Sequence, residues 1–217
     1  MTSNVLGLIG KKEISDEQAM RKFQNGNAGS FDVLLNRHSA GVLRFIMKMT
    51  GNNKIQAEDL LQEIFIKVIE RKNSYDPNQK FTTWLYSIAR NHCIDHLRTE
   101  SHRRHRSLDA PLSTEQQTGA VVLELMRSSE RGQDDKLYDK EIGQLLDSGL
   151  DSLKEEFKEV FVLKEIQGLS LNEISDITQA PLGTVKSRLR YAYQNLRQIF
   201  TESGYFDEIN KAKGASS

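Results

Sequence analysis

A basic helix that follows a tight turn is the stretch of this sequence with the clearest chemistry. No acidic residue lies between Leu182 and Phe200. One face of the predicted helix is expected to carry three cations and a tyrosine: Lys186, Arg190, Tyr193 and Arg197. Positive side chains on one helix face neutralise phosphates and reach base edges in the major groove. The pattern therefore indicates a surface that binds duplex DNA.

A short helix is predicted directly before this basic helix. Ser170 and Glu173 have the spacing of a capping box, which places a helix start at Leu171. Pro181 suits the beginning of the next helix, whose apolar positions form one inward stripe: Val185, Leu189, Ala192 and Leu196. Two such helices predict a helix-turn-helix unit that reads the major groove. A helical hairpin with a solvated basic face is the alternative interpretation.

A second stretch with polar chemistry follows a group of aromatic residues. The predicted helix at 81–102 opens with Phe81 and Trp84 and carries one polar face: Asn91, Asp95, Arg98 and His102. Cations hold phosphates, and aromatic rings stack on unpaired bases. This stretch therefore suits a nucleic-acid strand, although aromatic residues at helical spacing are more often part of a core, and we expect Trp84 to be buried.

Histidines four residues apart could share a metal ion, so His92 and His96 require a separate test. Cys93 lies about 100° around the helix from His92, which prevents it from joining the pair. The sequence contains no CxxC motif. We therefore expect no metal site, and no other pattern indicates a cofactor.

The elements that position these groups are all predicted to be helices. Apolar residues at helical spacing predict helices over 15–25, 30–51, 55–71 and 81–102. Ser152 and Glu155 have capping-box spacing, which predicts a further helix that ends at Gly168. His38 is expected to be a partly buried core histidine. The predicted fold class is therefore all-α.

The charge distribution divides the chain into two small helical domains joined by a flexible acidic linker. The 217 residues carry 30 basic and 30 acidic side chains, but basic residues predominate over 1–107 and acidic ones over 108–149. We expect domains at 15–106 and 139–204, a linker at 107–138, and tails at 1–14 and 205–217. One cysteine and the absence of a long apolar run favour a cytoplasmic protein without stable membrane insertion.

Two groups of motifs resemble the bacterial sigma-70 family. DLLQEIFIKV (59–68) and FTTWLYSIARNHCIDHLR (81–98) resemble its region 2. LKEEFKEVF (153–161), GLSLNEI (168–174) and GTVKSRL (183–189) resemble its region 4. Because no middle domain separates the two blocks, the order resembles the extracytoplasmic-function (ECF) group. The resemblance covers residues 15–106 and 139–200.

The resemblance implies a transcription initiation factor that is not itself an enzyme. Such a factor binds core RNA polymerase, directs it to −35 and −10 promoter DNA, and opens the duplex; an anti-sigma protein is an expected further partner. The residues implied in −35 recognition are Thr184, Lys186, Ser187, Arg188, Arg190 and Tyr191. Those implied at the −10 element are Tyr75, Asn78, Lys80, Phe81, Asn91, Asp95, Arg98, His102 and Arg103. Those implied in polymerase binding are Asp59, Leu61, Gln62, Phe65 and Ile66.

Two other functions compete with this interpretation. A helix-turn-helix regulator that acts without polymerase would explain 170–198 equally well but leaves the helix at 81–106 unexplained. A metal-dependent enzyme built on His92 and His96 is the weaker alternative. One departure from the family also matters: Tyr191 and Tyr193 stand where many relatives have arginine, so the −35 sequence that this chain reads stays open.

Overall fold

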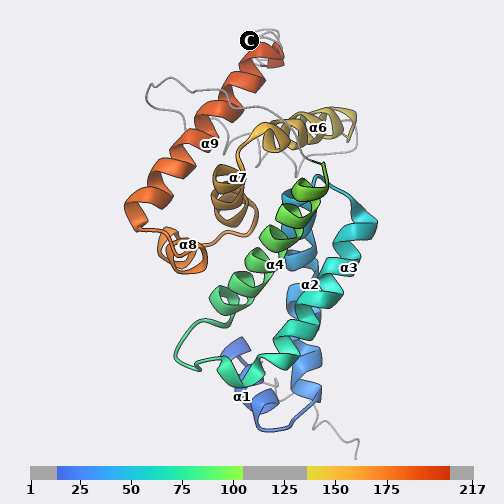
Figure 1. Ribbon diagram of the computed structural model, residues 1–217, viewed down its shortest axis with the longest axis vertical. Helices are drawn as coiled ribbons and strands as arrows, with labels where there is room; N and C mark the ends of the chain where they lie inside the picture. The colour runs from blue at the N-terminus through green and yellow to red at the C-terminus, as the bar shows by residue number, and fades with distance from the viewer. Residues whose placement is uncertain (1–13, 105–135, 206–217) are drawn as a thin grey trace, which may run out of the picture.

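The computed structural model describes residues 14–104 and 136–205, and every regular element in these ranges is helical (Figure 1). The N-terminal half (14–104) contains α1 (Asp16–Gln24), α2 (Gly29–Met49), α3 (Lys54–Glu70), the short helix η1 (Lys72–Ser74) and α4 (Phe81–Arg104). The C-terminal half (136–205) contains α6 (Lys136–Ser152), α7 (Glu155–Phe161), the π-helical turn η4 (Val162–Ile166), α8 (Leu171–Thr178) and α9 (Leu182–Glu202). The all-α prediction is confirmed for the described residues.

The predicted flexible linker and tails lie largely outside these ranges. Within the described part of the chain, no helix is both long and apolar enough to cross a membrane.

The N-terminal half is a helical bundle whose first helix starts at a predicted cap. The hydroxyl of Ser15 accepts the N–H of Gln18, and the Gln18 side chain accepts the N–H of Ser15, which confirms the capping box. Helices α1, α2, α3 and α4 surround a core that includes Phe45, Ile64 and Leu85, each fully buried. These residues come from the apolar stripes of the three long helices, so burial of those stripes fixes how the helices pack.

His38 and Trp84 lie at the margin of this core. The ring of His38 approaches Asp16 at 2.7 Å, with the histidine side chain 14% exposed, which confirms the prediction of a partly buried histidine. Trp84 is only half-buried, and its ring packs against that of Tyr75.

The C-terminal half differs from the sequence prediction at the start of α7. The Ser152 hydroxyl donates to the carbonyl of Gly149 in α6, and α7 begins after Lys154 without a side-chain cap. The capping box predicted for Ser152 and Glu155 is therefore wrong. Serine near a helix end satisfies carbonyls of its own helix as readily as amides of the next, so spacing alone does not separate the two cases.

Tyr193 is a second correction, because it does not lie on the exposed face of α9. Its side chain is 9% exposed, its ring packs edge-on against Phe161, and its hydroxyl donates to Glu165. The apolar face of α9 is wider than the four-residue stripe predicted from the sequence. A tyrosine can join such a face when its hydroxyl finds a polar partner at the edge.

The two halves pack against each other (Figure 1). Helix α8 lies against α4, while α7 and η4 contact α2. We call this packing the closed arrangement. It brings the helix-turn-helix unit, formed by α8 and α9, beside α4, the helix that opens with the aromatic residues Phe81 and Trp84.

Glu17 caps a helix other than its own, so its removal should destabilise the N-terminal half. Its Oε1 accepts the N–H of Phe81, the first residue of α4, at 3.2 Å. Loss of such a cap costs about 1 kcal/mol. We expect Glu17→Ala to lower the unfolding midpoint in scanning calorimetry by a few degrees. Glu17→Gln retains an acceptor and should lie closer to the wild type; three equal midpoints would contradict this role.

The same cap should weaken in acid. Burial raises the pKa of Glu17, but the N–H groups of Glu17 and Phe81 and the Ser15 hydroxyl outweigh burial, so the pKa lies below its ordinary value of 4.5. A carboxylate with a lowered pKa stabilises the fold above its unfolded-state pKa, and this contribution disappears as the pH falls through the folded-state value. The difference between wild type and Glu17→Ala should therefore shrink below pH 4.5.

Candidate nucleic-acid interface

The turn between α8 and α9 is fixed by local hydrogen bonds. The Glu173 carboxylate accepts the N–H of Ser170 at 2.9 Å, and the Ser170 hydroxyl accepts the N–H of Glu173 at 3.3 Å, which confirms the predicted box. Gln179 ends α8 in the left-handed conformation with φ of 54°. Pro181 then occupies the cap position before α9. These features turn the chain sharply, as a helix-turn-helix unit requires.

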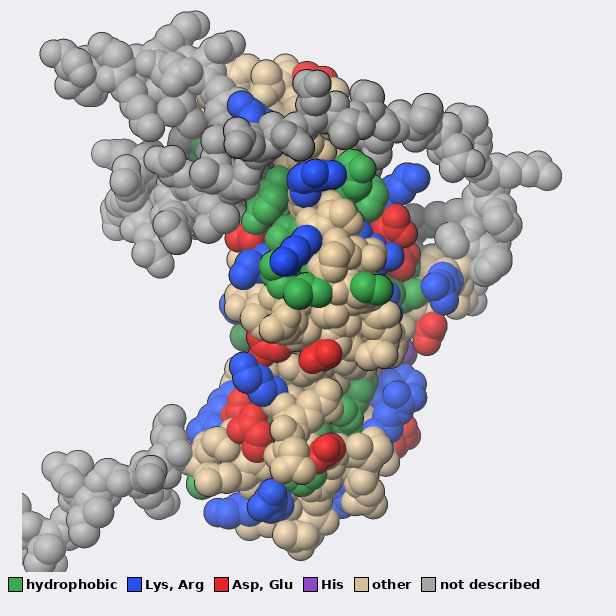
Figure 2. Space-filling view, turned by 90° about the vertical axis from the view of Figure 1, so that its left-hand side faces the viewer, with side chains coloured by type: hydrophobic (Ala, Val, Ile, Leu, Met, Phe, Trp, Pro, Cys, Tyr) green, Lys and Arg blue, Asp and Glu red, His purple; other side chains and the backbone are tan. Residues whose placement is uncertain are grey.

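The inner stripe of α9 is buried, as predicted, with Val185, Leu189, Ala192 and Leu196 no more than 9% exposed. Lys186 and Arg190 lie one turn apart on the exposed side of the helix. Figure 2 views the molecule from the side of α8 and α9 and shows Lys and Arg side chains on that face. The sequence therefore positioned two cations on the solvent side of α9, where they can approach a phosphate or a base edge.

The remaining residues predicted for −35 recognition are half-buried. The hydroxyl of Ser187 donates to the carbonyl of Thr184 at 2.9 Å. The ring of Tyr191 stacks on Phe157 with centroids 5.6 Å apart, and the guanidinium of Arg190 lies 5.5 Å from the Tyr191 ring centroid. The Tyr191 ring is therefore held by Phe157 and in turn supports the guanidinium of Arg190.

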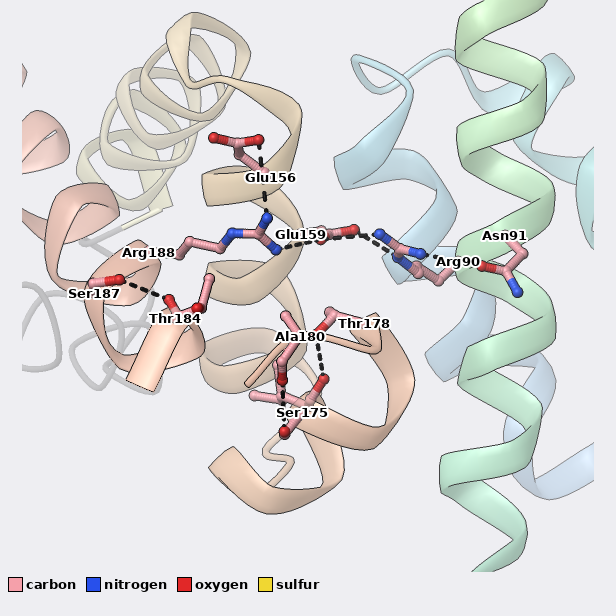
Figure 3. Close-up of polar contacts among 11 residues, drawn as sticks. Arg90, Asn91, Glu156, Glu159, Ser175, Thr178, Ala180, Thr184, Ser187 and Arg188 are labelled. Carbon is pink, nitrogen blue, oxygen red and sulfur yellow. Dashed lines mark hydrogen bonds and ion pairs between the residues drawn. The ribbon is translucent and has the colours of Figure 1, made fainter. Parts of the chain in front are cut away.

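Arg188 points toward α7 and two of its three glutamates (Figure 3). Its guanidinium lies 3.6 Å from Glu159 and 4.0 Å from Glu156. In the closed arrangement the arginine therefore neutralises protein carboxylates. A role on DNA phosphate stays a prediction, and it requires Arg188 to exchange those carboxylates for phosphate.

The polar face predicted on α4 is present over its described side chains. Asn91, Asp95 and Arg98 are all exposed. His102 and Arg103 lie within α4, but their side chains are outside the description. Positions four and three residues apart share a helix face, so the three described residues form one polar surface.

The two histidines tested as a metal pair each contact α3. His92 approaches Glu63 at 2.5 Å, and His96 approaches Gln56 at 2.7 Å. No group of three or more ligating side chains that could hold a metal ion occurs among the described residues. Cys93 is fully buried, and burial raises the pKa of its thiol to about 12. The thiol therefore stays protonated and unreactive at neutral pH.

The loop before α4 buries its aromatic rings and exposes its polar residues. Tyr75 is 3% exposed and Phe81 is fully buried, with their rings packed edge-on at 6.0 Å. Asn78 and Lys80 are exposed. Stacking of a base on either ring, which stays a prediction, would therefore require the loop to move, whereas the two polar side chains are already exposed to solvent.

Lys80 joins this loop to the helix-turn-helix unit. Its Nζ donates to Oε1 of Glu173 at 2.9 Å. Burial raises the pKa of Glu173, but hydrogen bonds from Ser170 and Lys80 outweigh burial, so the pKa lies below its ordinary value. Glu173 is therefore charged at neutral pH and attracts Lys80.

Helix α3 carries an exposed surface that combines polar and apolar side chains. Asp59, Gln62 and Ile66 are exposed, and Leu61 is half-buried. Phe65 is 5% exposed and packs edge-on against Phe31, so it supports this surface from below. Of the five residues predicted for polymerase binding, four thus reach the surface and Phe65 lies in the core, and their role in binding stays a prediction.

Sequence reasoning missed part of the α3 surface. The three large hydrophobic residues exposed in the described ranges all belong to this helix: Ile55, Ile66 and Ile69, at 77%, 53% and 43%. Helical spacing places them on one side of α3, together with Asp59 and Gln62. Apolar side chains gathered on one exposed helix face mark a protein-binding surface. The sequence signal that could have revealed this surface is the number of apolar residues in the predicted helix at 55–71, which is larger than a single core-facing stripe can bury.

Comparisons with known proteins match both halves of the chain to regions of one family. The family model for Sigma-70 region 2 matches residues 34–103, and that for Sigma-70, region 4 matches residues 149–198. ECF RNA polymerase sigma factor SigW of Bacillus subtilis is 29% identical over 86% of this chain and 97% of its own. RNA polymerase sigma factor CarQ of Myxococcus xanthus is 31% identical over 84% of this chain and 96% of its own.

A solved structure shares the fold. CnrH, determined in complex with the cytosolic domain of CnrY, superposes with a TM-score of 0.62 at 22% sequence identity. The match covers 87% of this chain and 99% of CnrH. The helical architecture of both halves therefore has a known counterpart.

Proposed function

Because this chain belongs to the sigma-70 family, in its ECF group, it is an alternative sigma factor, and we propose a function for each of its surfaces. The chain binds core RNA polymerase, directs it to −35 and −10 promoter elements, and promotes opening of the DNA. The observation that carries this proposal is the occurrence of two family regions in one chain, the second with an exposed cationic helix face. A regulator that acts without polymerase would leave the region 2 match unexplained.

Region 4 reads the −35 element through α9. The exposed side chains of Lys186 and Arg190 enter the major groove, where cations donate hydrogen bonds to guanine. The hydroxyls of Thr184 and Ser187 and the guanidinium of Arg188 bind phosphates or bases nearby. Tyr191, supported by Phe157, orients Arg190.

Region 2 binds the −10 element and holds opened DNA. The exposed loop residues Asn78 and Lys80 donate hydrogen bonds to an unpaired base or its phosphate, and movement of the loop exposes Tyr75 and Phe81 for stacking. Asn91, Asp95 and Arg98 on α4 guide the single strand, with His102 and Arg103 further along the helix. Capture of an unpaired base offsets the few kcal/mol that unpairing costs.

The surface on α3 binds core polymerase, which predicts a strong effect at Ile66. Its side chain is 53% exposed at the centre of the exposed face, so an acid there adds charge where apolar contact is needed. We expect Ile66→Asp to weaken polymerase binding at least about tenfold in surface plasmon resonance while the unfolding midpoint stays unchanged.

Ala40→Asp is the matched control for this prediction, since Ala40 is exposed and belongs to α2 rather than α3. It introduces the same charge and should leave the affinity for polymerase unchanged. Equal losses in both variants, or no loss in Ile66→Asp, would contradict the assignment of α3.

Core binding and promoter retention test the function as a whole. Gel filtration of the chain with sigma-free core polymerase should give a stoichiometric complex. That complex, and not the chain alone, should retain promoter fragments selected from genomic DNA. Retention of specific duplex fragments by the chain alone, without a complex with polymerase, would favour the conventional regulator instead.

An inhibitory partner is the further interaction that this proposal includes. CnrH, which shares the fold of this chain, was determined in complex with the cytosolic domain of CnrY. We expect a protein of anti-sigma type to bind this chain and to exclude core polymerase.

A further inference from the structure

The loop before α4 carries residues proposed for the −10 element, and helix α1 holds both of its ends. Nε2 of Gln24 donates to the backbone carbonyls of Lys72 and Tyr75 at 2.8 and 3.0 Å. At the other end, Oε1 of Glu17 accepts the N–H of Phe81 at 3.2 Å. One helix therefore fixes where the loop begins and where it ends, although it carries none of the residues proposed to contact DNA.

Gln24 supplies the long-range hydrogen bonds at the start of the loop. A side-chain amide has two N–H donors, and that of Gln24 contacts two carbonyls, 48 and 51 residues further along the chain. The preceding residue adds to the same anchor, because Nζ of Lys72 lies 4.9 Å from the centre of the Phe23 ring. Backbone carbonyls that lie near a core require such donors. The end of α1 and the first residues of the loop thus form one unit.

The anchored residue Tyr75 shapes the rest of the loop. Its hydroxyl donates to the carbonyl of Gln79 at 2.5 Å, and burial raises the pKa of Tyr75 to about 12, so the hydroxyl keeps its proton at neutral pH. Its ring packs against Trp84 with centroids 5.3 Å apart. Inside the turn, the Asp76 carboxylate accepts the backbone N–H and the side-chain amide of Asn78 at 2.9 and 3.0 Å. The placement of Asn78 therefore follows from that of Tyr75.

Gln24 holds the backbone of Tyr75 rather than its ring. The ring can therefore leave the core to stack on a base while the start of the loop stays in place. A binding site whose groups are already in position loses less conformational entropy when its ligand arrives. Such a site also separates one base from another more sharply, because polar groups that cannot move aside are left unpaired by the wrong base.

We propose that Gln24 is a positioning residue for the −10 element. By anchoring Tyr75, it sets Asn78 and Lys80 in the arrangement that receives an unpaired base, and it thereby contributes to the choice of base. Gln24 itself touches no DNA. Its role in the choice of base rests on the proposed function, whereas the anchoring of the loop does not.

Trp84 reports the anchoring without any DNA, since it is the one tryptophan of the 217 residues and its ring packs against Tyr75. Gln24→Met removes both donors and keeps the length of the side chain. In the free full-length chain, this variant should make the fluorescence of Trp84 more sensitive to quenching by acrylamide. Equal quenching in Gln24→Met and wild type would overturn the anchoring, and the proposal with it.

Asn25→Ala is the matched control for this measurement. Asn25 is the next residue and also carries an amide, but its side chain is exposed, so quenching should stay at the wild-type value. Gln24→Glu provides the test in a second form, because it keeps the shape of the side chain and replaces its donors by acceptors. It should increase quenching as Gln24→Met does, with the helices of both variants checked by circular dichroism. An equal increase in Asn25→Ala would overturn the anchoring by Gln24.

Base preference tests the role in promoter opening. Open complexes formed by the full chain with core polymerase would be compared on promoters that carry each of the four bases at each −10 position. A wrong base typically lowers affinity about 5- to 150-fold, and Gln24→Met should reduce the strongest preference about threefold or more. Asn25→Ala should keep the wild-type preference, and binding of both variants to −35 duplex should stay unchanged.

The outcomes separate the positioning role from the proposed function. An equal loss of opening on every base would mean that Gln24 only stabilises the fold, and unchanged preferences despite increased quenching would mean that the anchored loop does not choose the base. Either result would overturn the positioning role. If no protein opened promoter DNA, wild type included, while quenching still responded to Gln24→Met, the proposed function would fail and the anchoring would stand.

Discussion

A chain that carries both Lys186→Ala and Arg190→Ala should bind −35 promoter DNA about a hundredfold more weakly, as part of the polymerase complex, than the wild type. Both side chains are exposed on the face of α9 opposite the buried stripe. A contact to a base edge contributes about 1–3 kcal/mol, and two such contacts multiply their effects on affinity. Fluorescence anisotropy with labelled duplex measures the loss.

The salt dependence and a control on the same helix distinguish groove reading from general attraction. The double variant should also show a shallower dependence of affinity on salt, since fewer counterions are released. Arg197→Ala removes a cation from an exposed position about two turns nearer the C-terminus and should have a smaller effect. A loss as large for Arg197→Ala as for the double variant would contradict the assignment of Lys186 and Arg190.

Arg98→Ala should impair DNA opening more than promoter binding. Arg98 is exposed on the α4 face with Asn91 and Asp95, whereas the −35 contacts lie on α9. Loss of a cation from a single-strand path removes stabilisation that exists only after the strands separate. We expect open complexes to decrease about tenfold or more, measured by 2-aminopurine fluorescence in the −10 element, with little change in the binding of closed duplex.

Arg98→Lys is the control for this prediction, because it retains the charge. It should recover most of the opening activity if the contact is to phosphate, which a point charge satisfies. An equal loss of duplex binding and of opening in Arg98→Ala would instead place Arg98 outside the strand path.

The local structure was predictable where one segment determines it. The boxes at Ser15 and Ser170 form because each polar side chain satisfies amides within its own first helical turn. The inner stripe of α9 follows from helical spacing alone. The capping box predicted at Ser152 does not form, because the same spacing occurs where α6 ends. The Ser152 hydroxyl donates instead to a carbonyl of α6.

Contacts between distant segments were not predictable. Arg90 and Glu159 are 69 residues apart, and nothing in either local pattern pairs them. Tyr193 was expected at the surface because a tyrosine beside cations resembles a polar residue, yet Phe161 of α7 supplies an apolar face and Glu165 of η4 supplies an acceptor for its hydroxyl. The burial of Tyr75 likewise depends on packing that spacing does not encode.

The most direct test of the central claim is whether this chain makes core polymerase open promoter DNA. Purified chain would be added to sigma-free core polymerase with genomic promoter fragments, and thymines that react with permanganate would be mapped. We predict discrete reactive patches that require both the chain and the polymerase and that disappear with Arg98→Ala. No reactive thymines, together with a footprint on duplex DNA by the chain alone, would contradict the assignment of sigma factor function.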